Sequence, residues 1–273
     1  MERLAKRLLN LERQSFLGQE SDAVFDRLHV AVIGLGGGGS HVVQQLAHLG
    51  VGNFLLFDAD VLEDTNLNRV VGATEDDVMS SRPKCSIAMR LIKSINNTAR
   101  VRALQARWQT DAEWLRDCDV IFGCVDSLVE RAQIEATARR YLIPYIDLGM
   151  DVHCVDKHYA VGGQVTVSLP GNSCLRCLGI ISDDGLQAET ANYKAAGHRP
   201  QVVWINGALA SLAVGSFVQL MTPWHQGNPH TLLEYDGNDE SVIYSPKLSI
   251  LAGRVCTHFR QLSDLGDPFW PAR

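Results

Sequence analysis

The sequence predicts an α/β fold, with a Rossmann-like, mostly parallel sheet, helices on both faces of that sheet and an antiparallel C-terminal extension. Short apolar runs alternate with helical stretches through residues 29–151, and this order is typical of a parallel sheet that helices cover on both faces. From about residue 152 the pattern changes, because the segments 158–171 and 231–245 read as antiparallel strands with turns.

The composition is that of an ordinary soluble globular protein, with 46% hydrophobic and 21% charged residues in a chain of 273. The formal net charge of -6 argues against a dedicated nucleic-acid-binding protein, so no nucleic acid is expected as a partner. The seven cysteines are scattered and odd in number. Together with the lack of a secretory leader pattern, they predict reduced thiols and a cytoplasmic protein.

One apolar segment, residues 201–221, has a composition that invites comparison with a membrane span. Asn206, Ser211 and Gln219 interrupt it, so we expect a buried helix and no association with a membrane. Its glycine, alanine and serine residues would let another helix pack closely against it.

The stretch 29–52 combines a strand, a glycine turn and a helix. The apolar run 29–33 suits a buried strand, and from Ser40 onward apolar residues recur at helical spacing. Residues without a Cβ let the turn bend sharply and let a phosphate approach the main chain, while the free N–H groups at the helix start favour an anion. The glycines of this turn are Gly34, Gly36, Gly37, Gly38 and Gly39.

Two acidic residues, Asp58 and Asp60, follow the second expected strand at residues 53–57. In dinucleotide-binding folds a carboxylate at this place accepts hydrogen bonds from ribose hydroxyls. The glycine turn and the acid together predict a nucleotide site, and they fit both NAD and ATP.

The alternation of strands and helices continues to residue 150. We expect a helix that begins near Pro83, a strand at 100–108, a short helix at 110–118, a strand that ends at Asp126, a helix at 127–142 and a strand at 144–150. Ligands of an open parallel sheet bind beyond the carboxyl ends of its strands, so the residues that follow each strand are the candidates for a site.

Four polar side chains fall at those ends: Asn66, Arg69, Lys84 and Asp126. Two cations, an amide and an acid exceed what a pyrophosphate held by backbone donors requires. They suit a triphosphate whose Mg²⁺ is held by Asp126. A nicotinamide-dependent oxidoreductase is the distant alternative, because it would need a hydride-transfer site and a general acid or base that the sequence does not display.

In these motifs the sequence resembles the ubiquitin-activating-enzyme-like adenylyltransferases of the ThiF/MoeB/HesA family, over about residues 11–220. The segment ERQ, with Arg13, is similar to the family's amino-terminal arginine–glutamine helix, and GLGGGGS is similar to its glycine turn. The ribose-binding acid lies in LFDAD, the asparagine–arginine pair in NLNR, the phosphate lysine in RPK and the metal-associated aspartate in CVDS. The agreement of these motifs in order makes the resemblance specific.

The resemblance implies one adenylation domain over residues 1–273. It would contain N-terminal helices at 1–28, a nucleotide-binding half at 29–151 and an acceptor-binding and dimerisation half at 152–273. The implied reaction uses ATP and Mg²⁺ to convert the C-terminal carboxylate of a small ubiquitin-like protein into an acyl-adenylate, and it releases pyrophosphate.

The resemblance also implies a role for each polar residue of the motifs. Cations would neutralise the phosphates and the charge of the departing pyrophosphate. In that scheme the cations are Arg13, Arg69 and Lys84, with Asn66 orienting the phosphates, Asp58 binding the ribose and Asp126 binding Mg²⁺. In the family the amino-terminal arginine reaches the neighbouring subunit's site, so Arg13 implies a homodimer with the helix at 201–221 as its candidate interface.

The cysteines suggest a zinc site or a thioester. Cys174 and Cys177 stand where the family often has the first half of a zinc site, but a second CxxC pair is missing. Cys256 and His258 would complete the four ligands of a structural zinc, and the alternative is a pair of free thiols. If the acyl group passes to a thiol, we expect Cys174 or Cys177, because Arg176 between them favours a thiolate. The competing route is direct transfer to a partner's thiol.

Two kinds of partner fit the acceptor half, a conjugating enzyme in a conjugation pathway and a sulfur carrier in a sulfur-transfer pathway. An enzyme that adenylates a small molecule, a peptide or a tRNA base would share every ATP-binding residue. A dimeric scaffold without turnover would have no reason to keep the cations. The glutamine that often follows the family's asparagine–arginine pair is replaced here by Val70, a change that removes no charge.

Overall fold

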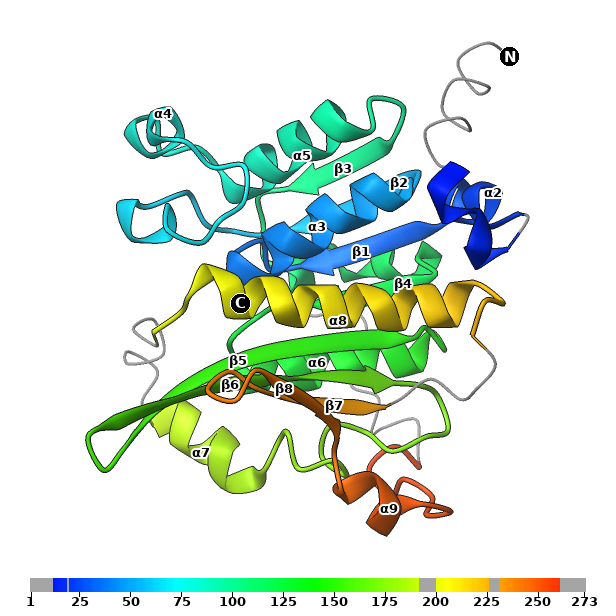
Figure 1. The fold of residues 1–273 in the computed structure, drawn as a ribbon, viewed down its shortest axis with the longest axis vertical. Coiled ribbons are helices and arrows are strands. Elements are labelled where there is room, and N and C mark those ends of the chain that lie inside the picture. The colour runs from blue at the N-terminus through cyan, green and yellow to red at the C-terminus, as the bar shows by residue number, and fades with distance from the viewer. Residues whose placement is uncertain (1–11, 19, 192–199, 226–230, 261–273) are drawn as a thin grey trace.

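A single eight-stranded sheet forms the centre of the molecule, in the order β3-β2-β1-β4-β5-β6-β7-β8 (Figure 1). The computed structural model describes residues 12–18, 20–191, 200–225 and 231–260. The strands are β1 (His29–Ile33), β2 (Asn53–Phe57), β3 (Arg100–Leu104), β4 (Val120–Gly123), β5 (Tyr145–Val155), β6 (His158–Ser168), β7 (Leu232–Asp236) and β8 (Ser241–Tyr244). The helices are η1 (Glu12–Leu17), α2 (Ser21–Arg27), α3 (Gly37–Leu49), η2 (Asp64–Asn66), α4 (Glu75–Met79), α5 (Lys84–Ile95), η3 (Trp108–Asp117), α6 (Leu128–Arg140), α7 (Asp183–Ala191), α8 (Val203–Met221) and α9 (Lys247–Leu251).

The direction of the strands confirms the predicted mostly parallel sheet with an antiparallel C-terminal extension. Strands β1 to β5 pair in parallel, whereas β6, β7 and β8 are added antiparallel. A two-residue turn joins β5 to β6, and Asp156 and Lys157 both have positive φ there, 47° and 70°, as tight hairpin turns require. The change of pattern near residue 152 therefore falls inside β5, which continues to Val155.

Helices cover both faces of the sheet, also as predicted. Successive residues of a strand point to opposite faces, so Val30 and Val32 join one core while Ala31 and Ile33 join the other. The first core contains residues of α3, α5 and α8, and the second contains residues of η3 and α6. Figure 1 shows α8 beside α3 over the near face of the sheet and α6 behind it.

The apolar helix α8 (Val203–Met221) is long and apolar enough to cross a bilayer, by length and composition alone. Half of that apolar stretch is buried inside the domain, where α8 packs against α3, β5 and β6. Core helices of soluble proteins pass the same test, so the helix is weak evidence for a membrane and its packing accords with a core element.

Local structure differs from the prediction in several short segments. The helix expected at 110–118 is a 3₁₀ helix, η3, which begins at Trp108 and is interrupted at Asp111 by non-helical dihedral angles. Helix α7 follows the cysteine turn without having been predicted. Helix α9, likewise not predicted, precedes the irregular segment that contains Cys256. Each difference is in a short segment whose conformation depends on tertiary contacts more than on periodicity.

A buried ion pair joins α6 to the centre of the sheet. The Arg131 guanidinium donates to both carboxylate oxygens of Asp147 on β5, with 2.9 Å from Nε to Oδ1. Tyr145 Oη donates to the same carboxylate at 2.8 Å. The Arg131 and Asp147 side chains are only 7% and 0% exposed, so each charge depends on the other for solvation.

We expect Arg131→Met to lower the free energy of unfolding by about 3–5 kcal/mol, because it leaves the buried Asp147 carboxylate without a counter-ion. Urea unfolding at neutral pH measures the loss. The double variant Arg131→Met/Asp147→Leu is the matched control, and it should lose less because both charges are gone. Equal losses in the single and double variants would show that packing, and not the uncompensated charge, causes the effect.

Candidate functional site

The turn between β1 and α3 packs backbone directly against backbone. Gly34 has a φ of +85°, a conformation that favours glycine. A Cβ on Gly39 would lie 1.9 Å from the carbonyl oxygen of Gly34, and a Cβ on Gly34 would lie 2.6 Å from the carbonyl oxygen of Cys124. Side chains are excluded at both positions, and the turn delivers the N-terminus of the 13-residue helix α3, where N–H groups and the helix dipole favour an anion.

Asp58, directly after β2, ties that strand to the glycine turn. Its Oδ2 accepts a hydrogen bond of 2.6 Å from the backbone N–H of Leu35, and its Oδ1 accepts one of 2.8 Å from the N–H of Asp60. Burial raises the pKa of Asp58, and the nearby positive charge of Lys84 opposes that rise. The carboxylate is therefore held in place by backbone donors at the position expected for a ribose-binding acid.

Lys84 is the first residue of α5, and only 11% of its side chain is exposed. Its Nζ lies 2.8 Å from Oδ2 of Asp60, which is 69% exposed. The backbone N–H of Lys84 also donates to the carbonyl oxygen of Asp60, at 3.1 Å. The start of α5 is thus anchored to the end of β2, and Asp60 serves as the counter-ion of Lys84.

A cavity of about 280 Å³ opens beside these residues. It lies beyond the carboxyl ends of the parallel strands, where open α/β sheets bind their ligands. Of the residues predicted for the site, the lining contains Gly34, Gly36, Asp58, Asp60, Lys84 and Asp126. The structure therefore brings together one cation, three acids and the glycine turn from segments that are far apart in the sequence.

Two of the predicted phosphate-binding residues, Asn66 and Arg69, do not line this cavity. Asn66 is 7% exposed, and its Oδ1 accepts from the backbone N–H of Glu63 in a capping box around η2. The Arg69 guanidinium donates to the carbonyl oxygen of Thr65 and to Oδ1 of Asn68, at 3.1 Å for the latter. In this structure both side chains stabilise their own loop, and their contacts with phosphates stay a prediction.

Val70, at the position where the family often has glutamine, is 6% exposed and forms a small apolar cluster with Leu62 and Ile87. This cluster packs the loop that carries Asn66 and Arg69 against α5. The replacement of glutamine by valine thus has a local physical reason.

Several cavity-lining residues have no counterpart in the sequence prediction. Arg107 and Trp108 follow β3, and Glu130 lies in the first turn of α6. Trp108 is 2% exposed, and its Nε1 has no hydrogen-bond partner among the described residues. Burial raises the pKa of Glu130. In the sequence, only their position after strands indicated that these residues could line the cavity, because the strand order brings them together.

Arg13 lies in η1, but its side chain is outside the described residues. The predicted role of Arg13 in a neighbouring subunit therefore stays a prediction.

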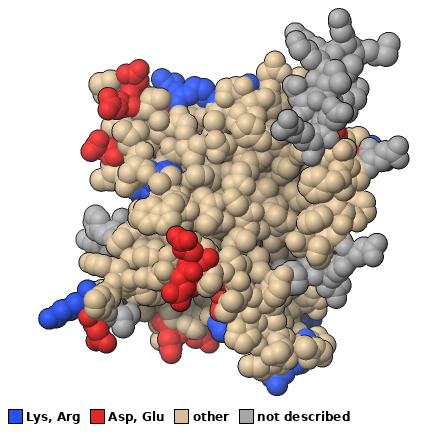
Figure 2. Space-filling view, in the orientation of Figure 1, with Lys and Arg blue, Asp and Glu red and all other residues tan. Residues whose placement is uncertain are grey.

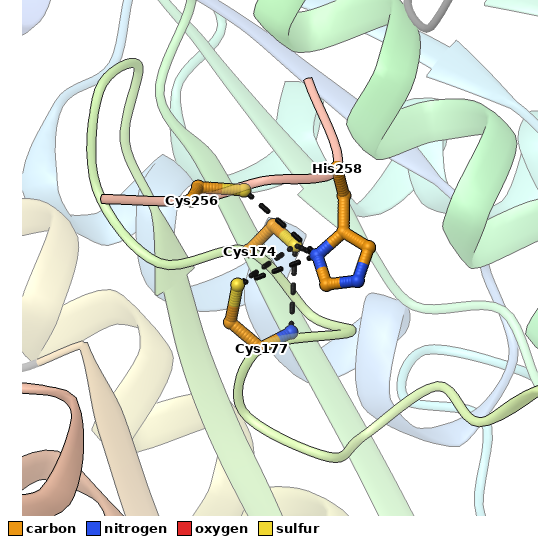
Figure 3. Close-up of side chains that lie close together, drawn as sticks. All are labelled: Cys174, Cys177, Cys256 and His258. Atoms are coloured by element: carbon orange, nitrogen blue, oxygen red, sulfur yellow. Dashed lines mark hydrogen bonds between the residues drawn. The ribbon is translucent and has the colours of Figure 1, made fainter. Parts of the chain in front are cut away.

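Three cysteines and a histidine form a second site, far from the glycine turn in sequence (Figure 3). The potential ligand atoms of Cys174, Cys177, Cys256 and His258 all lie within 4.8 Å of one another. His258 Nδ1 is 3.3 Å from Cys174 Sγ, 3.4 Å from Cys177 Sγ and 4.0 Å from Cys256 Sγ. Tetrahedral zinc, with bonds of about 2.0–2.3 Å, separates its ligands by about 3.5–4 Å. The set therefore fits a zinc ion in number and chemistry, and Cys174, Cys177 and His258 lie near this spacing.

The two thiols of the CxxC turn differ in environment. Cys174 is fully buried, and burial raises the pKa of its thiol. Cys177 is partly exposed; burial opposes its ionisation, but hydrogen bonds with Cys174, Cys256 and the Thr257 backbone together outweigh burial and lower its pKa. Of the two residues predicted for a thioester, Cys177 is thus the more accessible and the more easily ionised.

A buried network from α6 holds the CxxC turn. Glu135 Oε1 accepts from the backbone N–H of Leu175 at 3.0 Å. The Arg139 guanidinium donates to the carbonyl oxygens of Asn172 and Ser173, at 3.1 and 3.2 Å, and lies 4.9 Å from the ring centroid of Phe259. One helix therefore supports both chain segments that supply the cluster.

Comparisons with known proteins identify the family of this chain. A family model described as "ThiF family" matches residues 9–250. The sulfur carrier protein ThiS adenylyltransferase of Escherichia coli (strain K12) is 31% identical over 67% of this chain and 69% of its own length. The SAMP-activating enzyme E1 of Haloferax volcanii is 30% identical over 59% of this chain and 57% of its own length. The chain thus spans little more than half of the length of some relatives.

Solved structures show the same fold. The microcin C7 biosynthetic enzyme MccB in complex with N-formylated MccA superposes with a TM-score of 0.70 over 86% of this chain and 70% of that chain, at 20% identity. E. coli MccB with succinimide gives a TM-score of 0.71 over 86% and 71%, at 19% identity. Because the family model matches residues 9–250, which are most of this chain, the chain belongs to the ThiF family.

Proposed function

We propose that this protein uses ATP and Mg²⁺ to adenylate the C-terminal carboxylate of a small ubiquitin-like protein, for conjugation or sulfur transfer. The observation that carries this proposal is the 280 Å³ cavity, in which Asp58, Lys84 and Asp126 meet around the glycine turn. The names of relatives support it, because they include adenylyltransferases for a sulfur carrier protein and ubiquitin-like modifier-activating enzymes.

The chemistry assigns a task to each of these side chains. An acceptor carboxylate is already ionised, so it attacks the α-phosphorus of ATP without a general base, and pyrophosphate leaves. Lys84 would stabilise the charge that builds on the phosphates. Asp126 supplies a hard oxygen ligand of the kind that Mg²⁺ prefers, and Asp58 would hold the ribose. The N-terminus of α3 would face the phosphates.

The acceptor is inferred from the relatives. Those that act on sulfur carriers or ubiquitin-like modifiers align over 67% and 63% of this chain. A tRNA threonylcarbamoyladenosine dehydratase of E. coli, 30% identical, aligns over 48%. Among these relatives, the broader matches favour a protein acceptor over a tRNA base. The reaction would take place in the cytoplasm, where the cluster thiols stay reduced.

With a ubiquitin-like protein whose C-terminal tail is free, the enzyme should exchange labelled pyrophosphate into ATP. Asp126→Ala should abolish exchange, and Lys84→Ala should slow it by about 2–4 kcal/mol of transition-state stabilisation, the range for one positioned electrostatic contact. Lys93→Ala, at the other end of α5, is the matched control and should keep its exchange rate. Normal exchange in both site variants would overturn the adenylation proposal.

The proposal includes a homodimer in which Arg13 reaches the partner's nucleotide cavity. Helix α8 is a candidate interface, because Val203 and Trp204 are 40% and 63% exposed at its start. Figure 2 shows an uncharged band across the face where α8 lies. Uncharged surface of this kind is typical of the centre of subunit interfaces.

Arg13→Ala and Asp126→Ala proteins should each be inactive in pyrophosphate exchange. After mixing, they should regain part of the activity, because some heterodimers hold one site with both residues intact. Native mass spectrometry of isotope-labelled subunits verifies that exchange of subunits has occurred. If it has occurred and activity stays absent, Arg13 does not act across the interface.

The proposal also includes a structural zinc ion held by Cys174, Cys177, Cys256 and His258. These residues join a turn after β6 to the segment after α9, so metal binding would close a chain loop of about 80 residues and contribute directly to folding. Ligation would also occupy the Cys177 thiol, and acyl transfer would then proceed directly to a partner.

Protein purified in reducing buffer should contain about one zinc ion per chain, as a four-ligand structural site requires. His258→Ala and Cys177→Ser should lose the metal, and a chelator should lower the melting temperature of the wild type. Cys154→Ser, at an exposed position on β5, is the control and should retain metal. A metal-free wild type that forms a reducible adduct with the acceptor, lost in Cys174→Ala/Cys177→Ala, would instead support the thioester.

A further inference from the structure

Gln201 lies where the nucleotide cavity meets a second, smaller cavity. Its Nε2 donates to Oδ2 of Asp126 over 2.9 Å. The smaller cavity, of about 50 Å³, shares Gly36, Cys124 and Asp126 with the nucleotide cavity. Its other walls are Gly37 and Gly38 of the glycine turn, two apolar residues of β5, Gln201 and Asn206. Asp126 is therefore a common wall, and Gln201 approaches it from the side of the small cavity.

The backbone on the Gln201 side is held by Asn206, in the first turns of α8. Asn206 is 5% exposed, and its Nδ2 donates to the carbonyl oxygen of Val202 at 3.0 Å. The same amide packs on Gly37, where a Cβ would lie 2.5 Å from Nδ2. The start of α8 is thus docked on the glycine turn.

The backbone on the Asp126 side is held by Glu189 of α7. Its carboxylate accepts from the Ser127 hydroxyl and from the backbone N–H of Leu128, at 2.7 Å for the latter. With both main-chain segments fixed, the flexible part of the Gln201–Asp126 contact is the glutamine side chain itself.

The Gln201 amide opposes the binding of a cation to Asp126. An N–H donor places the positive end of its dipole against the carboxylate, which repels a nearby cation and occupies one of the oxygen lone pairs. Mg²⁺ requires a near-ideal octahedral arrangement of oxygen ligands. A cation that engages Asp126 therefore gains from the departure of the amide.

We propose that Gln201 is a positioning residue that competes with the Mg²⁺ of MgATP for Asp126 and, once displaced, donates its amide N–H to the acceptor carboxylate in the small cavity. This inference rests on the adenylation proposed above. In this scheme the Gln201 amide can donate to the acceptor carboxylate only when MgATP is bound. A neutral amide suits this task, because it donates to a carboxylate without the strong pairing that a cation would form.

The test measures affinity for an ATP analogue with a methylene group between the α- and β-phosphorus atoms, by isothermal titration calorimetry. With Mg²⁺, Gln201→Ala should bind the analogue about 2- to 10-fold more tightly than the wild type, the change expected for loss of one competing hydrogen bond. With EDTA in place of Mg²⁺, the variant should bind no more tightly, because the bare Asp126 carboxylate repels the phosphates. Gln187→Ala, at an exposed position on α7, is the control and should match the wild type under both conditions.

Steady-state pyrophosphate exchange tests the second half of the inference. Gln201→Ala should lower the KM for MgATP and raise the KM for a ubiquitin-like acceptor, and Gln201→Glu should raise the acceptor KM further because it replaces a donor by a negative charge. A merely structural role would move both constants in the same direction.

The outcomes separate this inference from the function on which it rests. If the wild type does not bind the analogue with Mg²⁺, the adenylation proposal fails. If the wild type binds and Gln201→Ala binds equally or more weakly with Mg²⁺, the competition is overturned while the function stands. Tighter binding of the variant that is equally large in EDTA would also overturn it, because the gain would not involve the cation.

Discussion

The fold around the nucleotide cavity depends on the backbone contact between Gly34 and Gly39. A Cβ on Gly39 would lie 1.9 Å from the carbonyl oxygen of Gly34, so this contact leaves no room for a side chain. It also brings the start of α3 onto the ends of β1 and β4. Asp58 is held by the N–H of Leu35 in the same turn, and Asn206 of α8 packs on Gly37. A larger residue at position 39 would displace Asp58, the start of α3 and the α8 contact together.

Helix α6 links the two candidate sites. It begins directly after Asp126, with Ser127 as its N-cap, and its buried face carries Arg131, Glu135 and Arg139. Arg131 pairs with the sheet, whereas Glu135 and Arg139 hold the turn that supplies Cys174 and Cys177. Buried ion pairs are weak evidence for stability, and the contacts of these three residues join separate parts of the fold. The helix thereby connects the end of the cavity at Asp126 to the sheet and to the CxxC turn.

The sequence was sufficient for the parts of the fold that repeat a strong local pattern. The strand, glycine turn and helix of residues 29–49 were predictable, and so were Asp58, Lys84 and Asp126, since parallel strands bring their carboxyl ends to one edge.

Trp108 and Glu130 were not predictable, because they meet only through the order β1-β4 in the sheet and an irregular η3. Asn66 was expected at the phosphates, yet its side chain hydrogen-bonds to the Thr65 hydroxyl and the N–H of Glu63, local contacts that compete with any distant one. Cys256 and His258 were considered as zinc ligands only because zinc needs four ligands. They lie beside the CxxC turn because the chain returns there after β8.

Because the cluster thiols lie close together, their oxidation state depends on how the protein has been stored. The sulfurs of Cys174 and Cys177 are 3.6 Å apart, and a CxxC pair of this kind oxidises readily once no metal protects it. Oxidation in air would convert two of the four proposed ligands into a disulfide that added zinc could not reverse. A sample stripped of metal and stored without reductant would then stay metal-free until the thiols were regenerated, while the nucleotide cavity, built by other residues, would retain its shape.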